Sequence, residues 1–168
     1  SSYAFCTTTS YRTGYSSSIY TAQELNDMGI QINNRINGIS LHSGATGGTI
    51  RHAKVYVAET TLEGYGTTAA NDTTDRNTMT LVYSGDLVVP INSWVDITFD
   101  TPFVYSGNNN LLISLIHDTN TTAAVSFYYT STSPNYLNCY GYRSATSTAG
   151  NSAVRSYNRP NIDRKSVV

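Results

Sequence analysis

Charged residues are scarce in this sequence. They make up 12% of its 168 residues, and the formal net charge is −1. The ten lysines and arginines form no cluster, so the chain lacks the basic patch that binds a nucleic-acid backbone or an anionic membrane. It also has no run of 18 apolar residues, the length that a membrane-spanning helix needs. We therefore predict no nucleic-acid partner and no membrane span.

Motifs for catalysis are also missing. There is no G-x-S-x-G sequence and no cysteine beside a candidate catalytic histidine. A glycosidase needs two placed carboxylates, and nothing marks such a pair among eight aspartates and Glu24, Glu59 and Glu63. No spacing that would bring ligands to one metal ion occurs among His42, His52 and His117. We predict that the protein is not an enzyme, with no catalytic residues.

Only two cysteines are present, Cys6 and Cys139, and their separation excludes a C-x-x-C redox or zinc motif. The chain begins at Ser1 rather than at Met, which we interpret as a processed, secreted protein. Two distant cysteines in a secreted chain favour one structural disulfide, either within the chain or to a neighbouring subunit. In the loop-entropy description, a disulfide that closes so long a loop adds about 4–5 kcal/mol of stability. The alternative is two unrelated buried thiols.

Serine, threonine and asparagine together fill 60 of the 168 positions, and there are 14 tyrosines. Threonine and tyrosine suit a pleated sheet, and asparagine suits turns. Helical periodicity is nearly absent, except that Thr21 and Glu24 have the spacing of a capping box and predict one short helical turn. Strand patterns between turn signals occur at residues 1–9, 35–41, 50–58, 79–89, 94–99, 111–116, 123–130, 137–142, 153–157 and 159–162. About nine to eleven short strands at this spacing predict an all-β jelly-roll sandwich.

Two segments predict where the core lies. Residues 94–99 alternate cleanly, with Val95, Ile97 and Phe99 on one face, and residues 111–116 form the most continuous apolar run, as in a central strand. We expect Trp94 to be a core residue, buried or half-buried against the sheet, and not a platform for a ligand. The domain organisation that we predict is an N-terminal strand or extension at residues 1–14 and one sandwich at residues 15–168.

Several stretches resemble a known family. Residues 94–103 read WVDITFDTPF and are followed by YSG at 105–107 and NNLLI at 109–113; VYSG at 82–85, AKVYVAET at 53–60 and RPNI at 159–162 fit the same pattern. Over residues 15–163 the chain resembles the jelly-roll modules of Bacteroidota surface proteins, the gingipain-type cleaved adhesin group. The resemblance implies an adhesive or accessory module on a bacterial surface. It does not transfer a ligand, because fold does not determine function.

Two kinds of loop site are predicted. Related modules often hold structural Ca²⁺, and the oxygen ligands that such a hard cation prefers are offered by Asn71, Asp72, Asp75 and Asp118. The alternative is that these residues only form turns. Glycosylation signals occur at Asn71 and Asn120 as N-x-[ST], and at Thr73 as a sequence resembling the Bacteroidota O-glycosylation signal.

Aromatic residues suggest a contact surface. The candidates are Tyr3, Phe5, Tyr128, Tyr129, Tyr136, Tyr140 and Tyr142. They predict either an interface with neighbouring subunits, where tyrosine is common, or a platform on which sugar rings stack.

These observations lead to two hypotheses on function. The first is a non-enzymatic extracellular structural or adhesive module that assembles with copies of itself into a surface filament by N-terminal strand addition. The second is a carbohydrate-binding module that recognises glycans or host-surface ligands.

Overall fold

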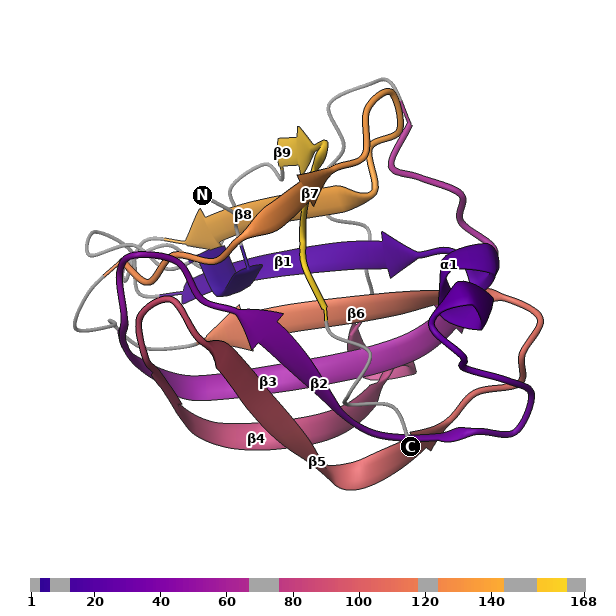
Figure 1. The fold of residues 1–168 in the computed structure, drawn as a ribbon, viewed down its shortest axis with the longest axis horizontal. Helices are drawn as coiled ribbons and strands as arrows, with labels where there is room; N and C mark the ends of the chain where they lie inside the picture. Colours follow the sequence, from indigo (N-terminus) through magenta and orange to yellow (C-terminus); the bar gives the residue numbers. More distant parts are fainter. Residues whose placement is uncertain (1–3, 7–12, 67–75, 118–123, 144–153, 163–168) are drawn as a thin grey trace.

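The computed structural model describes residues 4–6, 13–66, 76–117, 124–143 and 154–162, without the side chains of Cys6, Tyr142 and Arg143. Within these residues the chain forms ten strands, one short α-helix and two 3₁₀ turns (Figure 1). All strand pairs are antiparallel. The all-β sandwich predicted from the sequence is confirmed.

The larger layer is a six-stranded sheet. Its order is β4 (Thr80–Val89), β3 (Gly48–Thr60), β6 (Asn110–His117), β1 (Thr13–Tyr20), β8 (Asn138–Arg143) and β9 (Val154–Ser156). The apolar run at residues 111–116 lies in β6, which pairs with β3 on one side and β1 on the other. β6 is therefore a central strand, as predicted. A strand that is covered on both faces is rich in apolar residues along its whole length, which explains the apolar run.

The smaller layer consists of two strand pairs. They are β2 (Arg35–His42) with β5 (Trp94–Val104), and β7 (Tyr129–Ser131) with β10 (Asn158–Pro160). Two isolated bridges, Leu41 to Ile162 and Ser43 to Phe127, join these pairs. Figure 1 shows β2 and β5 crossing in front of β3 and β4. The chain passes from one layer to the other at most connections, as in a jelly roll.

Alternating side chains fill the space between the layers. In β5 the burial pattern alternates from Trp94 onward, with Val95, Ile97 and Phe99 inside, as predicted. The exposure of Trp94 differs from our expectation, because this residue is 45% exposed on the outer face. The reason is its phase in the strand, because successive side chains point to opposite faces and Trp94 shares its face with Asp96 and Thr98.

The predicted helical turn is α1 (Ala22–Asp27), and its capping box is confirmed. The Glu24 N–H donates to Thr21 Oγ1 at 3.2 Å, and the Thr21 N–H donates to the Glu24 carboxylate at 2.8 Å. This local pairing satisfies helix N–H groups that have no partner within the helix. None of the described helices has the length and apolar character needed to cross a bilayer.

Residues 4–6, the described part of the N-terminal segment predicted as a strand, differ from that prediction. Ala4–Cys6 form a 3₁₀ turn, η1, which lies against β1, β6 and β8. Phe5 adopts φ 57°, and its side chain is 0% exposed, with its ring centroid 6.4 Å from that of Phe127. Burial of this large ring between the layers replaces strand pairing. In this structure Phe5 is therefore buried in the core of its own chain and is not part of an exposed aromatic platform.

Candidate binding surface

Three aromatic rings form a continuous stack, which we call the aromatic row: Trp94, His42 and Tyr128. The ring centroids of His42 and Trp94 lie 4.8 Å apart at an interplanar angle of 28°, and those of His42 and Tyr128 lie 4.7 Å apart at 24°. Trp94 and Tyr128 are 45% and 46% exposed, and His42 is half-buried. The three rings therefore lie face to face, and the faces of His42 are covered by Trp94 and Tyr128.

Strand register places these rings side by side. His42 in β2 is the paired partner of Trp94 in β5, and paired residues point to the same face of a sheet. The bridge between Ser43 and Phe127 brings the next segment alongside β2, and the Tyr128 N–H donates to the His42 carbonyl at 2.8 Å. Three chain segments distant in sequence therefore build the row.

A surface hollow of about 270 Å³ adjoins Trp94. Its lining combines apolar and polar groups: Tyr20, Met28, Trp94, Thr130, Arg159, Pro160, Asn161 and Ile162. Thr130 Oγ1 donates to Asn161 Oδ1 at 2.7 Å, which fixes the orientation of the Asn161 amide. Trp94 is the residue that the row and the hollow share.

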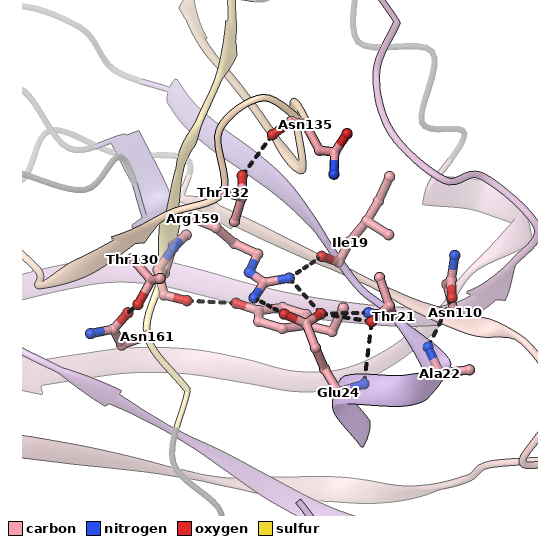
Figure 2. Close-up of polar contacts among 12 residues, drawn as sticks. Ile19, Thr21, Ala22, Glu24, Asn110, Thr130, Thr132, Asn135, Arg159 and Asn161 are labelled. Carbon is pink, nitrogen blue, oxygen red and sulfur yellow. Dashed lines mark hydrogen bonds and ion pairs between the residues drawn. The ribbon is translucent and has the colours of Figure 1, made fainter. Parts of the chain in front are cut away.

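A polar network connects residues that line the hollow to α1 and β1 (Figure 2). The Arg159 guanidinium makes a two-pronged ion pair with Glu24, through Nη2 to Oε1 at 2.6 Å and Nη1 to Oε2 at 2.9 Å. Arg159 Nη1 also donates to the Ile19 carbonyl at 2.7 Å, and the guanidinium lies 4.4 Å from the centroid of the Tyr20 ring. The network ties β10 to α1 and β1.

The network shifts the pKa values of its ionisable groups, Glu24 and Tyr20 among them. Partial burial alone would raise the pKa of Glu24, but hydrogen bonds from Arg159 and Thr21, with the charge of Arg159, outweigh it and lower this pKa below its usual 4.5. Burial raises the pKa of Tyr20 to about 12, and the charge of Arg159 opposes this rise. Because the Arg159 charge is neutralised by Glu24 and buried, the hollow offers no exposed cation to a ligand.

Sequence analysis predicted seven aromatic contact residues, and the described ones do not form one platform. Tyr128 belongs to the row, and Tyr129 beside it in sequence is 42% exposed and outside the stack. Tyr136 stacks on Tyr157, with ring centroids 4.1 Å apart, in another hollow. Tyr140 is half-buried in β8. Tyr3 and the Tyr142 side chain lie outside the described residues.

The predicted loop sites lie outside the described residues. These are the calcium ligands Asn71, Asp72, Asp75 and Asp118 and the glycosylation residues Asn71, Thr73 and Asn120. Among the residues that are described, no group of three or more His, Cys, Asp or Glu side chains could hold a metal ion. The calcium and glycan assignments stay predictions.

Two residues of the row carry signals that sequence analysis could have used. The alternation of residues 94–99 already placed Trp94 with Asp96 and Thr98 on the solvent side. Tyr128 was among the predicted aromatics, whereas His42 had no distinguishing pattern. A search against models of protein families and against curated protein sequences found no match to this chain. The site must therefore be interpreted from its own chemistry.

Formation of the predicted disulfide depends on the position of η1, which contains Cys6. Cys139 is buried in β8, beside Tyr15, and η1, which contains Cys6, lies against the same strand. No disulfide is recorded among the described side chains, and that of Cys6 is not one of them. The Cys6–Cys139 pairing stays a prediction.

We expect intact mass spectrometry of freshly isolated protein, with thiol alkylation under denaturing conditions, to find both cysteines unlabelled. The packing of η1 on β8 holds the two chain segments together, which favours closure of the bond within one subunit. After reduction both cysteines should become labelled. Two labelled thiols before reduction would contradict the disulfide, and a doubled mass that falls on reduction would show an intermolecular bond.

Proposed function

We propose that this protein is a non-enzymatic extracellular structural subunit of the adhesive-module class, which assembles with copies of itself through its N-terminal residues. The observation that carries the proposal is the complete burial of Phe5 by a turn that belongs to no described sheet. Ala4–Cys6 act as a plug between the two layers, contacting β1, β6 and β8 on one side and Phe127 on the other.

Such a plug is a separable part of the fold. Burying a phenylalanine side chain contributes about 1.5–3 kcal/mol, yet the plug adds no ladder of main-chain hydrogen bonds to a described sheet. Phe5 also adopts a positive φ, which is unfavourable for a residue with a bulky side chain. The contacts that hold the plug are therefore the same whether it comes from its own chain or from another copy.

The connection to β1 limits how the exchange works. Six residues separate Cys6 from Thr13, and six residues span at most about 20 Å when extended. The accepting copy must therefore lie directly beside the donor, at the end of the sandwich where β1 begins. Donation of a plug from each copy to the next is a head-to-tail contact, which produces a filament when it does not close. The low charge of the chain leaves little repulsion against such stacking.

We expect full-length protein to form assemblies larger than the 18.3 kDa chain as its concentration rises, measured by light scattering and electron microscopy. An excess of a synthetic peptide of residues 1–9 should shorten these assemblies, because it occupies the plug site of accepting copies. The same peptide with Phe5→Ala is the matched control and should have no effect. A protein that stays monomeric at high concentration, or assemblies unaffected by the native peptide, would contradict the proposal.

A further inference from the structure

A second hollow, of about 340 Å³, is lined by residues from three segments of the chain, at 63–66, 134–136 and 155–157. Main-chain hydrogen bonds connect these segments. The Tyr65 N–H donates to the Tyr136 carbonyl at 2.9 Å, and the Thr132 N–H donates to the Tyr157 carbonyl at 2.9 Å. The hollow is therefore preformed, and its volume is near the lower end for ligand sites, which suits a small molecule rather than a polymer.

Two contacts fix the guanidinium of Arg155 in this hollow. Its Nη1 donates to the Gly66 carbonyl at 2.8 Å. The guanidinium also lies 4.3 Å from the centroid of the Tyr136 ring, which in turn stacks on Tyr157. Stacking occupies the face of a guanidinium and leaves the N–H groups at its edge available to planar acceptors. In the part of the chain that the structure describes, Nε and Nη2 of Arg155 donate no hydrogen bond.

An acidic side chain, that of Glu63, lines the same hollow. Among the described residues Glu63 has no ion-pair partner, so it and Arg155 share the hollow without neutralising each other. Arg159 in the first hollow is different, because Glu24 neutralises it. A purely anionic ligand would gain Arg155 but meet the like charge of Glu63, and a purely cationic ligand would have the reverse problem. A ligand that carries both charges gains both attractions.

We propose that this hollow binds a small zwitterion of the α-amino acid type, with its carboxylate on Arg155 and its ammonium group on Glu63. A carboxylate is planar and accepts two parallel hydrogen bonds from a guanidinium, and an ammonium group has only donors, which a carboxylate such as that of Glu63 accepts. The proposal does not depend on assembly through the plug.

Three forms of one amino acid separate the contributions of the two charges. Leucine carries both charges, N-acetyl-leucine carries only the carboxylate, and leucinamide carries only the ammonium group. Alanine, phenylalanine and glutamine with their matching derivatives are tested in the same way. The measurement is an NMR chemical-shift titration of full-length protein at constant ionic strength, at protein concentrations where light scattering shows no assembly.

We expect at least one free amino acid to bind about tenfold more tightly than either of its derivatives, because each derivative loses one charge-assisted pairing. Equal binding of the N-acetyl derivative would show a simple anion site and would overturn the proposal. Equal binding of the amide would show a simple cation site, with the same consequence. The proposal would also fail if none of the four amino acids bound saturably.

Variants then assign the two charges to their residues. Arg155→Gln should weaken binding of the amino acid about tenfold. Glu63→Gln should weaken it as well but should tighten binding of the N-acetyl derivative, because the like charge is gone; a merely structural disturbance would weaken both. Arg51→Gln is the matched control, since Arg51 is exposed and pairs with Asp86 outside the hollow. Equal weakening by the control, or weaker binding of the N-acetyl derivative to Glu63→Gln, would overturn the proposal.

Discussion

Replacing Phe5 with alanine should lower the free energy of unfolding by about 3–5 kcal/mol, the usual cost of truncating a buried phenylalanine. Phe5 is 0% exposed and packs between the larger layer and Phe127. Truncation to alanine removes this contact area and leaves a cavity that a close-packed interior cannot fill without strain. Denaturant unfolding followed by circular dichroism measures the loss.

Trp94→Ala is the informative control for Phe5→Ala. From the sequence we expected Trp94 to be buried or half-buried, but its exposed position predicts a loss of about 1 kcal/mol or less, the range of surface substitutions. A Phe5→Ala variant as stable as the wild type would show that the plug contributes nothing to the monomer. The plug would then dock only in an assembly, which the competition with the peptide of residues 1–9 described above would reveal.

Replacing Arg159 with alanine should cost about 3 kcal/mol, near the lower end for breaking a buried ion pair. The Arg159 side chain is 9% exposed, and its removal leaves the Ile19 carbonyl and the Glu24 carboxylate without their strongest donors. Glu24 is 37% exposed, so water compensates part of the loss. Chemical unfolding at neutral pH measures the effect, and a loss under about 1 kcal/mol would contradict it.

The same ion pair predicts a dependence on pH. The pKa of Glu24 is lower in the folded protein than its usual 4.5, so its contribution to stability is fully present above about pH 4.5. This contribution is lost as the pH falls through the lower, folded-state pKa, because the folded protein must then take up the proton against its pairing with Arg159. Arg159→Ala should therefore make stability vary less between neutral pH and about pH 3. Glu24→Gln, which cannot titrate, is the matched control.

Local sequence was sufficient for much of the fold. The capping box of Thr21 and Glu24 spans four residues and forms as predicted, because both partners lie within one helical turn. The alternation in β5 and the apolar run in β6 likewise depend only on the period of a strand and the burial of its faces. The N-terminal turn was missed because alternation of Tyr3 and Phe5 over so few residues does not distinguish a strand from a turn that buries one ring.

By itself the sequence determined an all-β sandwich with few charges, a short capped helix and a central apolar strand, because these depend on composition and on contacts between near neighbours in the chain. Only the tertiary structure decided the surface. The aromatic row joins Trp94, His42 and Tyr128 from three separate segments, and Arg159 reaches Glu24 across 135 residues. Such contacts depend on which strands pair and in which register, and that is settled by the packing of the whole core rather than by any local pattern.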